Sequence, residues 1–243
     1  MIGIVGFGRF GKLTAQYLSK DYDVYVYDIV DMSDDIIANG AIPAALEDVC
    51  RQEVVVLPVP ISEFRQTLKT INPLLKKGVV VIDVCSVKEW PAQWMKELLP
   101  QDVSILATHP IFGPDSAADS LKGRKIALCK ERIETHCYEK IKSYLSSKGL
   151  IVIETTSAEH DRQIAVSLAL THFIGRSLSE FGANDLGMDS EGYKRLLHIL
   201  EVVEHDTWQL FEDMHRYNPY AREKRVEFME AMRSIEERLT EQK

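Results

Sequence analysis

The sequence has few cysteines and no excess of positive charge, and these two features exclude several classes of protein. Its four cysteines form no CxxC pair, so we expect no zinc or other metal site and no disulfide framework. Reduced thiols in apolar surroundings favour a cytoplasmic protein. The formal charge of −8 makes binding to the backbone of a nucleic acid a poor expectation.

Long hydrophobic runs are also absent. No segment approaches the ~20 consecutive apolar residues that a membrane-spanning helix needs, so we expect no membrane partner. The apolar N-terminal run stops at the segment Gly6-Phe7-Gly8-Arg9 without a preceding basic stretch or a following cleavage pattern. This pattern predicts that the chain carries no signal peptide.

Proline is nearly missing from the second part of the chain. Residues 1–156 hold nine of the 13 glycines and eight of the nine prolines, whereas residues 157–243 hold only Pro219. The second part also carries most of the acidity, with 11 basic and 17 acidic residues. We therefore place a domain boundary between residues 156 and 157.

The first part alternates short β-branched runs with amphipathic stretches. Apolar runs of this kind are typical of buried, largely parallel strands, and their alternation with helices predicts an α/β fold with a doubly wound, mostly parallel sheet. The expected strands are 2–5, 24–27, 54–57, 79–84, 103–107, 126–129 and 150–153, and the expected helices include 12–19, 63–71, 90–98 and 135–147.

The second part is predicted to be all helical. Residues 156–159 form a capping box that opens a long helix ending near Gly182, and its apolar surface predicts that this helix is buried. Asn218-Pro219 is expected to start the last helix. There Phe228, Met232, Ile235 and Leu239 form an apolar seam that favours a homodimer joined through this domain.

A glycine-rich loop follows the first expected strand and precedes the first expected helix. Its residues are Gly6, Phe7, Gly8, Arg9, Phe10 and Gly11, and Asp28 ends the next strand 17 residues later. Together these features predict a Rossmann-type dinucleotide site, with the pyrophosphate at the helix N-terminus. Asp28 can accept hydrogen bonds from both ribose hydroxyls and would repel a 2′-phosphate, so NAD is favoured, although Arg9 leaves NADP open.

Polar residues follow three further strands at the same edge of the sheet, where ligands gather. Pro58 follows strand 54–57 and is assigned to the cofactor site. The later strings are DVCSVK from Asp83 and THPIFGPDS from Thr108. From the residues alone, His109 could equally be a turn histidine, Ser86 a helix cap, and Lys88 a solvated residue or a substrate contact.

These two strings, the preceding glycine loop and a third string, EHDR from Glu159 with LTHF from Leu170, resemble the prephenate/arogenate dehydrogenases of tyrosine biosynthesis. The resemblance covers about residues 2–220 and implies an oxidoreductase that releases CO2 while the substrate ring becomes aromatic. It implies that His109 is the catalytic histidine and that Ser86 bonds both this histidine and the substrate hydroxyl. We expect the pKa of this histidine to be near neutrality without perturbation.

The same resemblance implies that the helical domain binds the substrate. His172 matches a histidine near the substrate, and residues from Ser190 onward resemble the plant-type branch, in which an aspartate at position 206 goes with arogenate. His198 lies where many bacterial members carry an arginine for the substrate carboxylate. His160 and Asp161 are expected to form an interdomain hydrogen-bond network.

The sequence leaves several alternative interpretations of the site and the activity open. Asp206 could instead cap a helix or solvate an acidic face. The substrate could be prephenate, and the enzyme could be another dehydrogenase of this architecture, such as a β-hydroxyacid dehydrogenase or an imine reductase. A nucleotide-sensing module without catalysis is the alternative outside enzymology. We expect neither a separate regulatory domain for tyrosine nor a fused mutase segment.

Overall fold

The computed structural model describes residues 1–204 and 206–241, and the chain divides into two units, residues 1–160 and 161–243. The boundary drawn from composition, after residue 156, falls at the N-terminus of helix α7 (Ser157–Ile164). Among the described residues, no helix combines the length and the apolar character that crossing a bilayer requires. All four cysteines are free, and three of them are buried.

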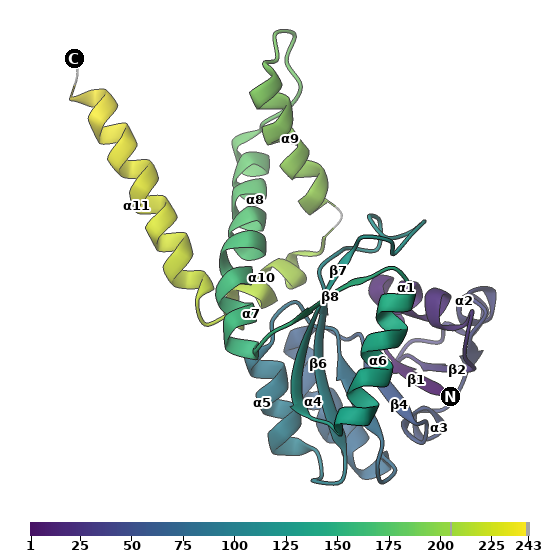
Figure 1. Ribbon diagram of the computed structural model, residues 1–243. Coiled ribbons are helices and arrows are strands. Elements are labelled where there is room, and N and C mark those ends of the chain that lie inside the picture. The colour runs from purple at the N-terminus through teal and green to yellow at the C-terminus, as the bar shows by residue number, and fades with distance from the viewer. Residues whose placement is uncertain (205, 242–243) are drawn as a thin grey trace. The chain divides into compact units, whose positions relative to one another are not determined.

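One eight-stranded sheet organises the first unit (Figure 1). The strand order is β3-β2-β1-β4-β5-β6-β7-β8, and of these neighbours only β6 and β7 pair antiparallel. This confirms the predicted mostly parallel sheet. The strands are β1 (Ile2–Val5), β2 (Val24–Tyr27), β3 (Ile42–Pro43), β4 (Val54–Leu57), β5 (Val80–Asp83), β6 (Ser104–Pro110), β7 (Lys125–Arg132) and β8 (Ile151–Glu154).

Helices cover both faces of this sheet. In Figure 1, α1 and α6 lie on one face and α4 and α5 on the other. Three short elements between β2 and β4, namely α2, β3 and α3, were not predicted, because elements of two to six residues show too little periodicity to be recognised. The helices are α1 (Arg9–Leu18), α2 (Ser33–Ala38), α3 (Leu46–Cys50), α4 (Ile61–Ile71), the 3₁₀ turn η1 (Asn72–Leu74), α5 (Glu89–Leu98) and α6 (Thr135–Ser147).

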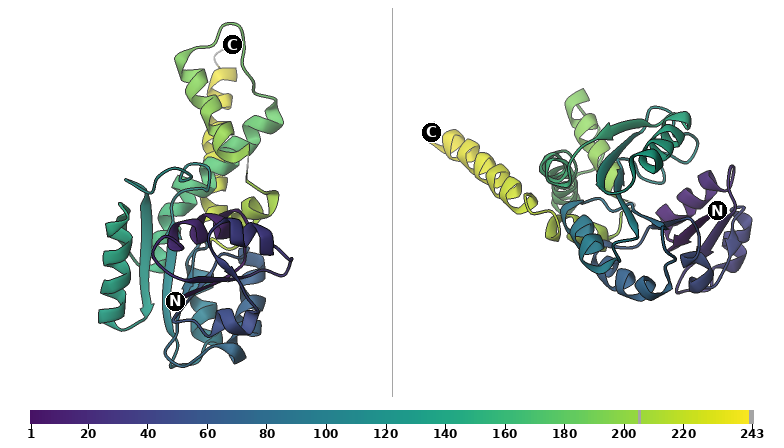
Figure 2. Two further views of the ribbon diagram at one scale, coloured as in Figure 1. Left: turned by 90° about the vertical axis from the view of Figure 1, so that its right-hand side faces the viewer. Right: turned by 60° about the horizontal axis from the view of Figure 1, so that its bottom comes forward.

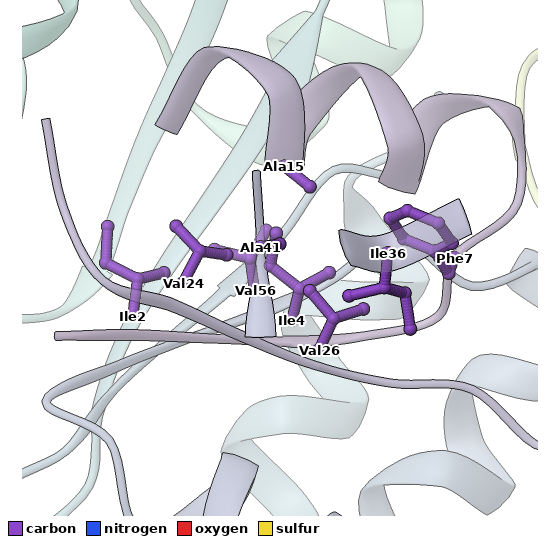
Figure 3. Packing of buried hydrophobic residues seen from close by; sticks show 9 residues of the cluster. All are labelled: Ile2, Ile4, Phe7, Ala15, Val24, Val26, Ile36, Ala41 and Val56. Carbon is purple, nitrogen blue, oxygen red and sulfur yellow. The ribbon is translucent and has the colours of Figure 1, made fainter. Parts of the chain in front are cut away.

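The core beneath α1 holds the first strand firmly. All four residues of β1 are buried, and Figure 3 shows Ile4, Val26 and Val56 from three neighbouring strands packed with Ala15 of α1. Because β1 lies between β2 and β4, the winding of the chain reverses there. The carboxyl ends of β1 and β4 therefore flank the crevice in which this type of sheet binds ligands.

The second unit is helical throughout the described residues, as predicted. Its elements after α7 are the π-helical turn η2 (Ala165–Leu170), α8 (Thr171–Phe181), α9 (Glu191–Glu204), α10 (Trp208–Arg216) and α11 (Ala221–Thr240). Thr156 caps α7 through a bond from the Glu159 N–H (3.2 Å), and Gly182 ends α8 with φ of 79°. Gly175 lets α8 approach α9, because a Cβ there would lie 2.9 Å from the Val203 methyl groups.

Two expectations for these helices need correction. The helix that continues from α7 is not buried on most sides, since Phe181 is 81% exposed and Val166 47% exposed. The other described helices of this unit leave these two side chains uncovered. The last helix begins at Ala221, after a turn in which the Asn218 side chain accepts from the Tyr220 N–H (2.9 Å). In Figure 2, α11 is the yellow helix ending at the C-terminus.

Candidate active site

The glycine loop after β1 is shaped by close backbone contacts. Gly6 has φ of +109°, and a Cβ there would lie 2.8 Å from the Pro58 carbonyl oxygen, while one on Gly11 would lie 2.3 Å from the Gly6 oxygen. Only glycine fits either position. At Gly8, the N-cap of α1, a Cβ would meet nothing within 4 Å. The N-terminus of α1 therefore faces open space, which suits an anionic pyrophosphate.

Asp28 ties the end of β2 to this loop. Its carboxylate accepts hydrogen bonds from the backbone N–H of Phe7 (2.6 Å) and of Val30 (3.0 Å). Each carboxylate oxygen retains further acceptor capacity for a ligand hydroxyl. An open pocket of about 410 Å³ adjoins it, lined by Asp28 and by neighbours that include Val30, Met32 and Pro43. The loop, the carboxylate and the pocket together fit a nicotinamide dinucleotide.

Arg9 and Phe10 contact the segment that follows β6. Nη2 of Arg9 lies 2.6 Å from the Asp115 carboxylate, and the rings of Phe10 and Phe112 are 6.2 Å apart. The Arg9 side chain is 46% exposed, so this ion pair adds little to stability. These contacts join the predicted cofactor loop to the segment that directly follows His109 and Pro110.

His109 lies at the carboxyl end of β6 and is only 5% exposed. Its Nδ1 is 2.8 Å from Nε2 of His160, which leaves Nε2 of His109 as the nitrogen available to a substrate. Burial, followed by the nearby His160 ring and Lys88 ammonium, holds the pKa of His109 well below 6.5. The expectation of an unperturbed histidine is therefore wrong, because a buried imidazolium loses its hydration.

Ser86 follows β5 and presents a buried hydroxyl. Within the described part of the chain, its Oγ has no hydrogen-bond partner, so the expected bond to His109 is not formed. The helix-cap reading also fails, since α5 is preceded by Lys88 and has no side-chain cap. A buried hydroxyl without a partner is costly unless a ligand satisfies it.

Lys88 is neither solvated nor exposed to a ligand. Its side chain and that of Asp83 are both 0% exposed and form an ion pair. The Lys88 ammonium also donates to the carbonyl of Thr108, the residue before His109. Burial raises the pKa of Asp83, and Lys88 and the backbone N–H of Thr108 oppose this shift. Sequence reasoning missed this pair, because lysine is almost always solvated.

The second unit brings His172 and Asp206 together. His172 is 3% exposed, and its Nδ1 lies 3.7 Å from the Asp206 carboxylate. The atom has no hydrogen-bond partner among the residues that the structure describes. Burial lowers the pKa of His172, with Asp206 opposing and Arg176 adding to the shift. Arg176, which sequence reasoning missed, donates to the Asp206 carbonyl and stacks over the Trp208 ring.

Asp206 does not cap the next helix. Thr207 does so, since its hydroxyl accepts from the Leu210 N–H (3.1 Å). The Asp206 side chain is 22% exposed, so it does not belong to a fully solvated acidic face either. Asp206 is therefore neither a helix cap nor part of a solvated acidic face, and its carboxylate lies beside His172.

Ser190 and His198 make contacts that are local to α9. The Ser190 hydroxyl caps α9 by accepting from the Tyr193 N–H (3.1 Å). The His198 side chain is 72% exposed and lies 2.7 Å from Glu201 on the same helix. Lys194 of the same helix is exposed and pairs with Glu191. The structure thus brings two of the four predicted substrate residues together.

His160 contacts His109. We expect His160 and Asp161 to form a hydrogen-bond network between the predicted domains, and the bond from His160 to His109 crosses the boundary predicted after residue 156. The two rings are 5.0 Å apart between centroids, with 74° between their planes. The EHDR string marked the residue, whereas its partner lies 51 positions away in the sequence. No group of three or more His, Cys, Asp or Glu that could hold a metal ion occurs within residues 1–204 and 206–241.

Comparisons with known proteins agree on one family. A family model described as prephenate dehydrogenase, nucleotide-binding domain, matches residues 19–154, and one described as TYRAAT1-like, C-terminal domain, matches residues 177–243. The chain is 32% identical over 248 residues to arogenate dehydrogenase 1, chloroplastic, of Arabidopsis thaliana, and 31% identical over 252 residues to arogenate dehydrogenase 2, chloroplastic, of the same plant. Each alignment covers 98% of this chain, but 39% of the first relative and 69% of the second.

Solved structures show the same fold. The crystal structure of prephenate dehydrogenase from A. aeolicus in complex with hydroxyphenyl propionate and NAD+ matches with a TM-score of 0.79 at 21% identity, covering 99% of this chain and 91% of that one. Synechocystis arogenate dehydrogenase matches with a TM-score of 0.73 at 19% identity, covering 99% and 92%. Both likenesses extend over the α/β unit and the helical unit.

Proposed function

The chain belongs to the prephenate/arogenate dehydrogenase family, and we propose that it is an NAD-dependent arogenate dehydrogenase that converts L-arogenate to L-tyrosine and CO2. The observation that carries this proposal is that the buried His109 and the buried, unsatisfied Ser86 hydroxyl lie at the carboxyl ends of the neighbouring parallel strands β6 and β5, at the sheet edge that also holds the glycine loop. The second candidate is the same chemistry on prephenate, which yields 4-hydroxyphenylpyruvate.

The proposed reaction is a hydride transfer coupled to decarboxylation. A bound nicotinamide dinucleotide supplies the hydride acceptor. His109 accepts the proton of the C4 hydroxyl as the C4–H bond breaks with loss of hydride. The bond from C1 to the ring carboxylate breaks to release CO2, and its electron pair makes the ring aromatic. His109 then returns its proton to the phenolic oxygen, so that it ends the cycle neutral.

The surroundings of His109 and Ser86 suit these roles. A neutral imidazole can accept a proton, and the lowered pKa keeps His109 neutral at physiological pH. His160 occupies Nδ1 and thereby orients the ring. Ser86 donates or accepts one hydrogen bond at the substrate hydroxyl, which satisfies its buried Oγ.

NAD is the proposed cofactor because of Asp28. Its carboxylate is fixed by two backbone N–H groups at the end of β2, where it can accept bonds from ribose hydroxyls. A 2′-phosphate would bring like charges together at this point. Arg9 offers little compensation, since Asp115 neutralises its charge. NADP is therefore the weaker cofactor in this proposal.

Asp206 supports arogenate over prephenate. Arogenate carries a side-chain ammonium where prephenate has a neutral keto group, and a half-buried carboxylate attracts the first and stays unpaired with the second. The backbone of Asp206 is held by Arg176, and its carboxylate adjoins His172. We assign His172 and Asp206 to substrate binding. Ser190 and His198 are retained only as weaker candidates, because each is already engaged within α9.

A homodimer through the helical unit is part of the proposal. Met232, Ile235 and Leu239 of α11 are 54%, 58% and 63% exposed, and α11 buries only Ala221 among its residues. An apolar stripe on a helix with so little burial favours a partner helix. Light scattering at micromolar concentration should give twice the 27.6 kDa chain mass; a stable monomer would contradict the dimer.

The compartment is a separate matter. The two Arabidopsis relatives are described as chloroplastic, and that location is theirs. The cytoplasmic location expected from the reduced cysteines stays a prediction for this chain.

The proposed function can be tested with an absorbance assay that follows formation of the reduced nicotinamide, with both substrates and both cofactors. We expect kcat/KM to be highest for arogenate with NAD+, and tyrosine and CO2 to form in equal amounts. A preference for prephenate would replace the substrate assignment, and a preference for NADP+ would overturn the role of Asp28. Binding of NAD+ without turnover of either substrate would favour the nucleotide-sensing alternative.

A further inference from the structure

The buried ion pair between Asp83 and Lys88 brackets the segment that carries Ser86. Asp83 is the last residue of β5, and Lys88 precedes α5. Both side chains are completely buried. Their contact closes the intervening turn from its two ends, so the position of Ser86 depends on this pair.

The same pair is bonded to the residue before His109. The Asp83 carboxylate accepts from the Thr108 N–H (2.8 Å), and the Thr108 hydroxyl donates to the Asp83 carbonyl (2.6 Å). Lys88 donates to the Thr108 carbonyl. Thr108 is thus held by its N–H, its carbonyl and its side chain, all within a network of three residues.

Stability alone does not account for this arrangement. Apolar residues of similar volume are often as stable as a buried ion pair or more so, and β5 and β6 already pair along their length from Val80 to Asp83. The added bonds lie only where the strands end. Their effect is to fix the Ser86 turn against the backbone that presents His109.

We propose that Asp83 and Lys88 are positioning residues that hold the Ser86 hydroxyl and the His109 ring in register for proton transfer. The inference rests on the proposed function, because it assigns these two residues to the same reaction. Neither is a catalytic residue, since their polar atoms are used on each other and on Thr108. The glycine loop follows β1 and Asp28 follows β2, so the cofactor site should be unaffected by substitution of Asp83 or Lys88.

The test uses Lys88→Met and the double variant Asp83→Asn/Lys88→Met. The double variant contains no unpaired buried charge, and its asparagine can still accept from the Thr108 N–H, so it keeps the protein folded if the single variant fails to fold. Because small displacements of reacting groups can lower rates by roughly 10²-fold, we expect kcat of both variants to fall by about that factor. The Kd of NAD+ should not change.

Lys96→Met is the matched control. Lys96 lies on α5 and forms a 2.7 Å ion pair with Glu131, but its side chain is 49% exposed. It should retain the kcat of the wild type. Wild-type kcat in the double variant would overturn the proposal, and so would an equal loss of kcat in Lys96→Met.

A second readout does not depend on turnover. Amide hydrogen exchange at Thr108 should be faster in both Lys88 variants than in the wild type and in Lys96→Met. The Thr108 N–H keeps an acceptor at position 83, but the Thr108 carbonyl loses the Lys88 ammonium, so this backbone should open more often. Unchanged exchange at Thr108 would overturn the proposal even if kcat fell. If the wild type turns over neither arogenate nor prephenate, the proposed function fails, and the exchange experiment still decides whether the pair positions this backbone.

Discussion

His109 and His172 are both buried histidines, but the two units surround them differently. The Nδ1 atom of His109 contacts His160, and the residue before it is held by three further bonds. The Nδ1 atom of His172 has no hydrogen-bond partner within the described residues, and the nearest carboxylate, on Asp206, is 3.7 Å away. The α/β unit thus fixes its reactive group in advance, whereas the helical unit keeps a polar group that a ligand can satisfy.

This difference separates chemistry from selectivity. Preorganised groups on rigid strands lower the barrier of a reaction because they need no rearrangement during it. Unsatisfied groups on less buried helices contribute mainly by choosing the ligand that satisfies them. We therefore expect substitutions around His109 to change kcat and substitutions around His172 to change the ratio of substrates.

His109→Asn should have the largest effect. Asparagine keeps a polar side chain near His160 but cannot accept a proton, and loss of a general base typically lowers the rate by 10²–10⁴-fold. The Kd of NAD+, measured by fluorescence, should stay the same. Ser86→Ala should lower kcat less, since it removes one hydrogen bond and no base. A kcat near that of the wild type in His109→Asn would end the assignment of chemistry to the first unit.

Asp206→Asn should have the next largest effect, and it should act on selectivity. A charge-assisted bond to the arogenate ammonium contributes about 1.5–3 kcal/mol, so the ratio of kcat/KM for arogenate and prephenate should shift roughly ten- to a hundredfold toward prephenate. Glu201→Gln is the matched control, because this carboxylate is exposed and pairs with His198. An unchanged ratio in Asp206→Asn, or an equal shift in both variants, would contradict the specificity role.

The pH dependence of kcat/KM should be a smaller effect, and it should follow the protonation of His109. Because burial lowers the pKa of His109 well below 6.5, the histidine should be neutral at pH 6.5, and kcat/KM should be nearly constant from that pH to about pH 8. The unfolded chain takes up this proton more readily than the folded one, so folding stability should fall as the pH drops below 6.5. An inflection of kcat/KM at or above pH 6.5 would contradict the neutral base.

Much of the first unit could be predicted because its signals are local. Strand β1, the glycine loop and Asp28 lie within a short stretch, and each has a steric or electrostatic reason for its residue type. The contacts of Lys88 and His160 could not be predicted, since burial of a lysine and a bond across 51 positions depend on how the strands assemble. For Lys88 the ordinary preference for solvent gave the wrong expectation.

The second unit was harder to predict for a different reason. The apolar residues of the helix that continues from α7 predicted burial, yet Phe181 is 81% exposed, because an apolar pattern along a helix does not determine which neighbours will cover it. The predicted Asp206 and His172 did come together, but this placement rested on a family resemblance. Arg176 carried no local signal, since an arginine on a helix is usually solvated.

Thr207→Ala should have the smallest effect, and it separates helix capping from selectivity at neighbouring positions. The Thr207 hydroxyl accepts from the Leu210 N–H at the start of α10 (3.1 Å), and loss of such a cap costs about 0.5–2 kcal/mol of stability. For a chain of this size, a loss of 1 kcal/mol lowers Tm by roughly 2–4 °C, which calorimetry can measure. Thr156→Ala, which removes the cap of α7, is the matched control.

The ratio of kcat/KM for the two substrates should stay at the wild-type value in both cap variants. The Asp206 carboxylate takes no part in capping α10, so a selectivity that depends on its charge should survive loss of the cap. If Thr207→Ala shifted the ratio as far as Asp206→Asn does, the shift would come from the start of α10 rather than from a carboxylate facing an ammonium. Substrate selectivity in the helical unit would then depend on the conformation at the start of α10 and not on the charge of Asp206.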